Sequence, residues 1–399
     1  MPDDRTFDVI VVGAGVVGCS IAYHLAAAGL KTALLDQGQV GAGASGANSG
    51  MVQSNDAELK HSIPMVTASF ARYEHLEEEL GMSLDFKRTG ILHLLPTEEH
   101  WNSSIERAAA LSQAGIACEM LPAEQVHAIE PLINPAALVG AMYAPHQGQI
   151  NPFRLMWAYL RRAIPFGLAL HTYTEVTGFE VRSGRVRGVH TDQGSFSAAM
   201  VVLATAAWTH RLGKMLGQDW KIHTFRASAM VTETAGDLKL RSIISAADHI
   251  ELELDGKKDI ELAFLGLRQT SDGNFLIAQA DRPGDSLHPA ISPLAPKAMA
   301  IMTAKYFPVF RKVRLLRAWT APTTYTEDGC PFVGAVPGLE GLIMATAFRS
   351  SLINTPIAGE IVTELVLKGR CEVVDIHPFA LDRDMQPADT FYVVKSTDS

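Results

Sequence analysis

The N-terminal segment alternates between strand and helix patterns. Residues 7–12 (FDVIVV) form a short apolar run rich in β-branched side chains, which is typical of a strand buried on both faces of a parallel sheet. Residues 19–28 follow with helical character and stop at Gly29, and residues 32–36 form a second buried strand. These three segments predict a βαβ unit.

Four further helices are predicted by apolar residues at helical spacing, over 67–80, 102–115, 151–163 and 296–306. Asn151 and Pro152 are suited to the N-cap and the first turn of the helix over 151–163. Thr355 and Pro356 form the same kind of pair, so they predict the start of a last helix that ends at Gly369.

Strand patterns dominate the middle of the chain. Residues 172–203 predict a β meander, because turn residues at 183–184 and 192–194 separate apolar runs. Several alternating runs within 221–280 predict an antiparallel sheet, and residues 342–345 form a late buried strand.

The order of these elements predicts two discontinuous domains in an α/β fold. The first is a Rossmann-like dinucleotide-binding domain with a βαβ unit and a β meander, assigned to residues 1–90, 141–220 and 315–385. The second is an inserted α+β substrate domain with an antiparallel sheet, assigned to residues 91–140 and 221–314. Residues 386–399 form a polar tail.

Composition excludes several classes of protein. The chain has 399 residues, 47% of them hydrophobic, so it is long enough for two domains and too apolar to be disordered. A net charge of 34 − 43 = −9 argues against nucleic acid as a partner. No apolar run is long enough for a transmembrane helix, and the acidic N-terminus does not resemble a signal peptide. Four scattered cysteines without a CxxC motif favour a cytoplasmic protein, with peripheral association with the inner membrane left open.

The segment after the first strand contains a dinucleotide-binding fingerprint. Gly13 permits a tight turn, Gly15 lets the backbone approach a pyrophosphate, and Gly18 lets helix and strand pack closely. The helix N-terminus offers N–H groups to phosphate. Asp36 ends the second strand and is expected to bind the ribose hydroxyls of the adenosine, although a turn-capping role is the alternative. No Lys or Arg immediately follows Asp36, which disfavours NADP.

Several motifs in order make the chain resemble the FAD-dependent amine and D-amino-acid oxidoreductases, which include glycine oxidase and sarcosine oxidase. The resemblance covers nearly the whole chain. It rests on FDVIVVGAGVVGCSIAYHLAAAG, GAGASGANSG (41–50), GQINP (148–152), VVLATAAW (201–208) and TEDGCPFVG (326–334), and on the strand, loop and helix after Leu342. It implies a glutathione-reductase-type FAD-binding domain and a non-covalent FAD, since Cys330 follows the acid that an attachment cysteine precedes in sarcosine oxidase.

The resemblance implies a set of cofactor contacts. Ser45 is expected near the pyrophosphate, the backbone of Val176 near the adenine, and residues 349–353 beside the flavin ring. The full set of expected cofactor-binding residues is Gly13, Ala14, Gly15, Val16, Val17, Gly18, Asp36, Gln37, Ala44, Ser45, Ser49, Gly50, Met51, Val176, Ala204, Thr205, Trp208, Gly334, Arg349, Ser350, Ser351, Leu352 and Ile353.

The chain departs from the family pattern at three glycines and one arginine. Ala206, Ala347 and Leu352 stand where the family has glycine, which predicts a slightly remodelled flavin pocket; loss of flavin binding is the alternative. Glycine-oxidase-like members bind the substrate carboxylate through an arginine at a position that corresponds approximately to Thr323.

Other cations are therefore expected to bind the substrate. Arg268, on a predicted strand of the second domain, and Arg349, in the loop beside the flavin, are the candidates for a bidentate contact with a carboxylate. Surface or structural arginines are the alternative interpretation of both. His61 is a further candidate for the substrate side of the site, and no histidines have metal-ligand spacing.

The LRQTSDGN and FRSS segments are most similar to the β subunits of multi-subunit dehydrogenases that oxidise opines such as octopine and nopaline. This resemblance implies oxidation of a C–N bond by hydride transfer to flavin N5 and hydrolysis of the resulting imine. It also implies a second flavin-type subunit and a small iron–sulfur subunit as partners. Two alternatives stay open: a free-standing oxidase of glycine, sarcosine or a D-amino acid that produces peroxide, and a non-catalytic scaffold subunit.

Overall fold

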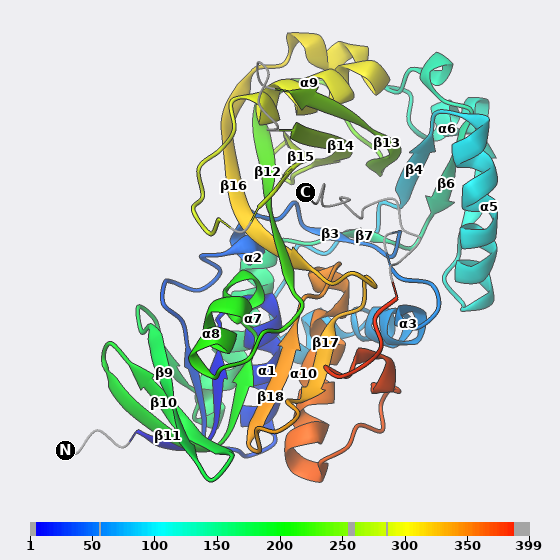
Figure 1. Cartoon of the computed structure of the whole chain (residues 1–399). Helices are drawn as coiled ribbons and strands as arrows, with labels where there is room; N and C mark the ends of the chain where they lie inside the picture. Colours follow the sequence, from blue (N-terminus) through cyan, green and yellow to red (C-terminus); the bar gives the residue numbers. More distant parts are fainter. Residues whose placement is uncertain (1–4, 56, 254–259, 285, 387–399) are drawn as a thin grey trace.

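Two eight-stranded sheets divide the protein into two halves (Figure 1). The computed structural model describes residues 5–386 except residues 56, 254–259 and 285. The first sheet lies in the lower half of Figure 1, and the second sheet forms the upper half.

The first sheet is built around the predicted βαβ unit. Its main order is β17-β18-β11-β1-β2-β8, in which β1 pairs in parallel with both β2 and β11. The meander predicted over 172–203 is present, because β9, β10 and β11 pair antiparallel in sequence. The strands are β1 (Thr6–Val12), β2 (Thr32–Leu35), β8 (Ala169–His171), β9 (Val176–Arg182), β10 (Arg185–Thr191), β11 (Gly194–Leu203), β17 (Phe332–Ala335) and β18 (Leu342–Thr346).

Helix α1 (Val16–Ala27) is buried almost all round because it packs against both α7 (Pro152–Ala163) and α10 (Ser351–Lys368). The side chain of Asn151 accepts the N–H groups of Phe153 and Arg154, so the predicted cap of α7 is confirmed. The helix expected over 67–80 is wrong as a single element: the structure has α3 (Ser62–Arg72) and α4 (Leu76–Leu80), separated by a turn at Tyr73–His75.

The second sheet has the order β16-β12-β15-β14-β13-β4-β6-β5 and is antiparallel except for the β13–β4 pair. Its strands are β4 (Ile91–Leu95), β5 (Glu119–Pro122), β6 (Gly140–Ala144), β12 (His223–Thr234), β13 (Ile243–Glu253), β14 (Ile260–Gln269), β15 (Asn274–Pro283) and β16 (Leu315–Tyr325). Helix α9 (Leu294–Tyr306) covers one face, as predicted over 296–306, and packs on β13, β14 and β15. The remaining helices of this half are α5 (Glu98–Gln113) and α6 (Ala123–Ile129).

Two expected domain boundaries are wrong. Strand β16 pairs with β12 along almost its whole length, so residues 315–325 belong to the second sheet and not to the nucleotide-binding domain. Strand β6 likewise extends past residue 141 in the second sheet. The physical reason is that a strand joins the sheet whose edge it can pair with, and the chain pattern alone does not show which edge is free.

A short connection joins the two halves. Strands β3 (Met51–Val52) and β7 (Gly148–Gln149) pair antiparallel between the sheets, with α2 (Ala44–Ala47) just before them and α8 (Thr209–Met215) after β11 (Figure 1). The expected α/β architecture is confirmed. In the described part of the chain, no helix combines the length and the apolar character that crossing a membrane requires.

Candidate active site and cofactor groove

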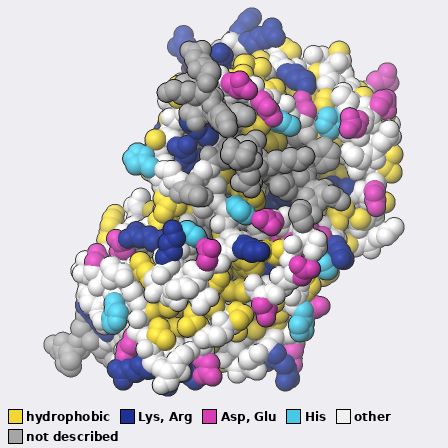
Figure 2. All heavy atoms as spheres, viewed as in Figure 1, with side chains coloured by type: hydrophobic (Ala, Val, Ile, Leu, Met, Phe, Trp, Pro, Cys, Tyr) yellow, Lys and Arg dark blue, Asp and Glu magenta, His cyan; other side chains and the backbone are white. Residues whose placement is uncertain are grey.

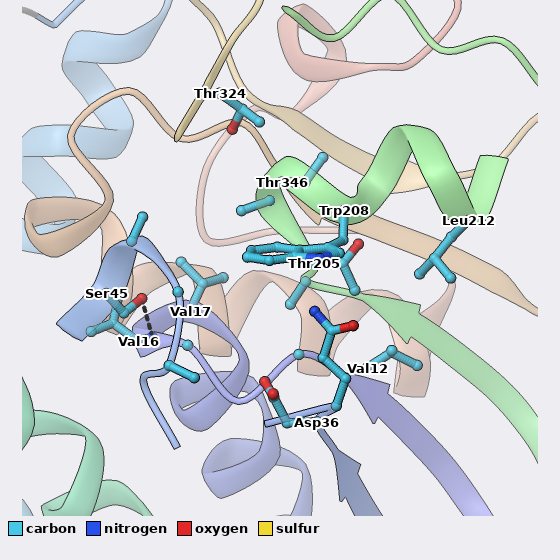
Figure 3. A pocket seen from close by; sticks show the side chains of 18 of the residues that line it. Val12, Val16, Val17, Asp36, Ser45, Thr205, Trp208, Leu212, Thr324 and Thr346 are labelled. Atoms are coloured by element: carbon cyan, nitrogen blue, oxygen red, sulfur yellow. Dashed lines mark hydrogen bonds between the residues drawn. The ribbon is translucent and has the colours of Figure 1, made fainter. Parts of the chain in front are cut away.

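An elongated cavity lies at the carboxyl ends of the central strands of the first sheet (Figure 3). The end of β1, the start of α1, the loop before α2, and the ends of β11 and β18 form its walls. This is the edge at which parallel α/β sheets bind ligands, because loops there diverge and helix N-termini face outward. The ring of Trp208 lies across the cavity between Thr346 and Thr205 (Figure 3).

Close contacts require the three fingerprint glycines, with backbone at Gly13 and Gly18 and with the Ser45 side chain at Gly15. Gly13 has a φ of +104°, and a Cβ there would lie 2.5 Å from the carbonyl oxygen of Ala204. A Cβ on Gly18 would lie 1.8 Å from the carbonyl oxygen of Gly13, so α1 could not pack on β1. A Cβ on Gly15 would lie 2.8 Å from Oγ of Ser45, at the N-terminus of α1. The turn therefore brings bare backbone to the cavity, as a pyrophosphate requires.

The Asp36 carboxylate organises the same turn from the end of β2. Its Oδ2 accepts the N–H of Ala14 at 2.7 Å, and its Oδ1 accepts the N–H of Gly38 at 2.8 Å. Burial raises the pKa of Asp36, and these two hydrogen bonds oppose the rise. Asp36 therefore caps the turn. This role does not exclude a contact with the ribose, because Asp36 lines the cavity and each of its oxygens can accept a further hydrogen bond.

Ser45 is positioned beside the first turn of α1. Its Oγ accepts the N–H of Val16 at 3.0 Å, shown as the dashed line in Figure 3. A hydroxyl and the N-terminal end of a twelve-residue helix thus meet at one point of the groove wall. This combination of an N–H-rich helix start and a small polar side chain suits a phosphate group.

Most of the expected cofactor residues surround this groove. Those in its walls are Gly13, Gly15, Val16, Val17, Asp36, Gln37, Ala44, Ser45, Val176, Ala204, Thr205, Trp208 and Ser351. Ser49, Met51 and Arg349 line a second, adjoining cavity instead. Seven expected residues line neither cavity: Ala14, Gly18, Gly50, Gly334, Ser350, Leu352 and Ile353. Ala14 and Gly18 act through the turn described above.

Sequence reasoning missed part of the groove. Thr174 and Glu175 lie in the wall next to the expected Val176, so their position in the chain was a usable signal. Arg211 and Leu212 of α8 also line the groove, and Arg211 pairs with Glu175 at 2.6 Å. No motif marks these two residues, because α8 reaches the groove only through the tertiary fold.

Two of the three departures from glycine keep the backbone that glycine would adopt. Ala206 has a φ of +42° and Ala347 a φ of +57°, both in the left-handed region, and both line the groove. The backbone is therefore held in place despite the added methyl groups. Leu352 lies inside α10, where a helical backbone makes no demand for glycine. The three residues therefore change the flavin pocket only through the volume of their side chains, and the backbone keeps the conformation that glycine would adopt.

The last helix starts earlier than the sequence pattern predicts, so Thr355-Pro356 as its start is wrong. Helix α10 begins at Ser351, and Pro356 lies inside it. A proline there leaves the carbonyl four residues earlier, that of Leu352, without its helical donor. The hydroxyl of Tyr73 donates to that carbonyl, and the Thr355 hydroxyl donates to the Ser351 carbonyl at 2.7 Å. The N-terminal end of α10 still reaches the groove at Ser351.

The second cavity lies between the groove and the upper sheet. Strands β12, β14, β15 and β16 supply one wall, and the segments around residues 44–55 and 348–351 supply the other. Ala44, Thr323, Thr324, Phe348 and Ser351 line both cavities, so the two form one continuous cleft. Thr323, at or near the position where the resemblance leads us to expect a carboxylate-binding arginine, therefore lies at the junction.

The structure separates the three expected substrate-binding residues. Arg349 lines the second cavity. Arg268 is 8% exposed and lines neither cavity; its guanidinium donates to the carbonyl of Ser49 and, at 3.2 Å, to Oε1 of Gln149. Burial lowers the pKa of Arg268 to about 10. Arg268 thus fixes the loop before β3, which agrees with the alternative interpretation of this residue as a structural arginine.

His61 also lies outside both cavities, at the N-cap position of α3, where its N–H donates to Glu58 Oε2 at 2.6 Å. Cys330 is buried, with its Sγ 3.8 Å from Ser62 Oγ and 3.5 Å from the same Glu58 oxygen, and lines neither cavity. Charged side chains of both signs are present on the face seen in Figure 2.

Comparisons with known proteins agree with this geometry. Residues 8–365 match the family model described as FAD dependent oxidoreductase. The chain is 27% identical over 386 residues to glycine oxidase from Geobacillus kaustophilus (strain HTA426), covering 94% of this chain and 97% of that protein. It is 26% identical over 392 residues to the sarcosine oxidase subunit beta of an Arthrobacter species, covering 95% and 91%.

Solved structures show the same fold. The crystal structure of glycine oxidase from Geobacillus kaustophilus superposes with a TM-score of 0.84 at 26% identity, covering 96% of this chain and all of that one. The L-proline dehydrogenase of P. horikoshii superposes with a TM-score of 0.82 at 23% identity, over 92% and 94% of the two chains. The fingerprint turn, the groove and these matches together place the chain in the FAD dependent oxidoreductase family, with FAD as its cofactor.

Proposed function

We propose that this enzyme oxidises the C–N bond of a secondary amine or amino acid, with the opines octopine and nopaline as the first candidates. Loss of a hydride and a proton would convert the amine to an imine, and water would then hydrolyse the imine to an amino acid and a 2-oxo acid. We further propose that the chain is the catalytic β subunit of a multi-subunit dehydrogenase of the cytoplasm, at most peripherally attached to the inner membrane.

The observation that carries this proposal is Arg349 in the wall of a cavity continuous with the FAD groove. A guanidinium there suits a carboxylate of the substrate. Relatives named for glycine and sarcosine favour the same chemistry, because each of these compounds joins an amine to a carboxylate. Opines carry two carboxylates on a secondary amine, so they would use Arg349 and a further polar anchor.

The protein's contribution is to bind, orient and shield the amine. Bound FAD supplies the acceptor for the hydride of the α C–H bond. Phe225, Phe264 and Leu265 give the second cavity apolar walls that limit access of water. The N-terminal end of α10 at Ser351 places a partial positive charge at the junction of the two cavities, where negative charge is stabilised. The amine must be neutral to be oxidised, so activity should rise with pH toward the pKa of the bound substrate.

Two alternatives differ in what happens after the amine is oxidised. A free-standing oxidase would pass electrons to oxygen and release peroxide, whereas a dehydrogenase subunit would need partner proteins, a second flavin-type subunit and a small iron–sulfur subunit. Similarity to the beta subunit of a sarcosine oxidase favours an assembly. A scaffold without flavin is disfavoured, because the glycine turn and the left-handed backbone at Ala206 and Ala347 are kept.

The test starts with the purified protein and its partners, if any co-purify. Flavin absorbance near 450 nm is expected, followed by anaerobic bleaching with octopine, nopaline, glycine or sarcosine. Dye reduction without peroxide would support a dehydrogenase, and stoichiometric peroxide would support the oxidase instead. Arg349→Met should raise KM for carboxylate-bearing amines, whereas Arg370→Met, at an exposed arginine paired with Glu372, should not. A protein that takes up FAD but is reduced by none of these amines contradicts the proposal.

A further inference from the structure

A buried carboxylate in the substrate cavity has an oxygen without a partner. Asp281 of β15 is 4% exposed and lines the second cavity. Its Oδ2 accepts a hydrogen bond from Nε2 of Gln279 at 2.6 Å. Its Oδ1 is buried and has no hydrogen-bond partner among the residues that the structure describes. Leaving such an oxygen unpaired is unfavourable, so a ligand that pairs with it is a physical expectation.

The strands beside Asp281 leave room for such a ligand. Ala227 of β12 lies directly opposite Asp281, and Ala321 of β16 lies directly opposite Ala227. Directly opposed residues of antiparallel strands point to the same face, and both alanines line the cavity. Small side chains therefore surround the carboxylate on this side, whereas Arg349 contributes the opposite charge to the same cavity.

We propose that Asp281 binds a cationic group of the substrate, so that the site selects amino-acid-derived amines with a guanidinium or ammonium side chain. The inference rests on the proposed function and narrows its substrate class. The cation would donate an N–H to Oδ1 of Asp281, while a substrate carboxylate binds Arg349. The group at Asp281 is a second nitrogen and not the amine that is oxidised, because a carboxylate would hold that amine protonated and block hydride loss.

The charges around Asp281 give this binding a pH dependence. Burial raises the pKa of Asp281 to about 8; the hydrogen bond from Gln279 opposes the rise, the Glu261 carboxylate of β14 adds to it, and Arg349 opposes it. The cavity residues of β12 and β16 include no acidic or basic side chain. Below pH 8 the empty site therefore holds a proton on Asp281, and a bound cation expels it. Affinity for a cationic ligand should rise as pH approaches 8 and level off above it.

Arginine and citrulline provide a matched pair of probes, since they have the same length and differ by a guanidinium against a neutral urea. Titration calorimetry of the FAD-loaded protein should show arginine bound more tightly by about tenfold or more, the gain expected of a charged hydrogen bond. The preference should grow between pH 6.5 and 8, with proton release seen as a dependence on the ionisation enthalpy of the buffer.

Variants locate the effect. Asp281→Asn should abolish the preference, with circular dichroism to check its fold. Glu261→Gln is the matched control, because Glu261 is a buried carboxylate that lines neither cavity. This variant should keep the preference for arginine. The pH at which the preference is half-developed should fall, because the Glu261 charge that raises the pKa of Asp281 is lost. A wild-type protein that binds both probes equally, or neither, overturns the proposal, and so does a preference that survives in Asp281→Asn. The wild-type comparison decides even if the variant does not fold.

Failure of this inference can be told apart from failure of the proposed function. The N-(1-carboxyethyl) derivatives of arginine (octopine) and of citrulline should both be oxidisable if the enzyme acts on secondary amines. Flavin reduction by the two at equal kcat/KM would refute the role of Asp281 and leave amine oxidation in place. A preference for arginine in binding, without flavin reduction by any amine, would refute amine oxidation and leave the cation site.

Discussion

The two alanines held in the left-handed backbone region make a sharp test of the groove. Ala347 has a φ of +57° and Ala206 a φ of +42°. An L-residue in this region is less stable by about 1–2 kcal/mol than in a right-handed conformation, and glycine removes that strain. Glycine also makes the unfolded chain more flexible, which destabilises the protein by about 0.4–1 kcal/mol. At half-buried Ala206 relief of strain is the larger effect, so Ala206→Gly should stabilise by roughly 0.5–1 kcal/mol. At buried Ala347 loss of the methyl group costs a further ~0.8 kcal/mol, which leaves Ala347→Gly close to neutral.

The expected change in melting temperature is small because the chain is long. An unfolding entropy of about 2.1 cal/mol/K per residue gives about 0.8 kcal/mol/K for 399 residues. Ala206→Gly combined with Ala347→Gly should therefore raise Tm by about 1 °C. Denaturant titration of the flavin-free protein measures the free energy of unfolding more directly, with the slope m unchanged.

Ala345 is the matched control for this experiment. It is as buried as Ala347 and lies two residues earlier, but it belongs to strand β18 and has no left-handed φ. Ala345→Gly should destabilise by about 1 kcal/mol, because glycine weakens a strand interior and the methyl group leaves a gap. If Ala347→Gly destabilises as much as Ala345→Gly does, the backbone at Ala347 is not held in the left-handed region and the description of the groove is wrong.

Three further changes test the groove and the cavity. Gly15→Ala should weaken FAD binding by about tenfold or more, measured by flavin fluorescence, because its Cβ would meet Ser45 Oγ at 2.8 Å; Gly178→Ala, with only His190 in ordinary contact, is the control. Asp36→Asn should lower FAD affinity by about 1–3 kcal/mol in the same assay, since an amide cannot accept both N–H groups through two oxygens, and unchanged affinity would contradict the geometry. For Asp281, a folded-state pKa raised to about 8 means that stability is greatest below the unfolded pKa near 4 and is lost as pH rises toward 8. The free energy of unfolding of the wild type should thus fall relative to Asp281→Asn by up to about 1.4 kcal/mol per pH unit, and parallel pH profiles would refute the raised pKa.

The local sequence pattern was sufficient for the βαβ unit that begins the nucleotide-binding half. The run over 7–12, the glycine turn and Asp36 predicted a βαβ unit, and the structure has β1, α1 and β2 at these positions. Local patterns suffice here because each feature depends on neighbours in the chain: burial on both strand faces, a helix start after glycine, and an acid at a strand end. The cap of α7 at Asn151 succeeded for the same reason, since a cap is made within three residues.

Contacts between distant segments determined the start of α10, the positions of the two arginines and the burial of Asp281. Such contacts leave no signal in the local sequence pattern. Residues 351–354 are helical because the hydroxyl of Tyr73 satisfies the carbonyl that Pro356 leaves open. Arg268 and Arg349 are equally good candidates in the sequence, yet packing directs Arg268 to the Ser49 carbonyl and leaves Arg349 in the cavity wall. No sequence motif marks Asp281, which follows the region predicted to form the antiparallel sheet. Only the pairing of β15 with β12, and of β12 with β16, turned it into a buried charge beside the substrate cavity.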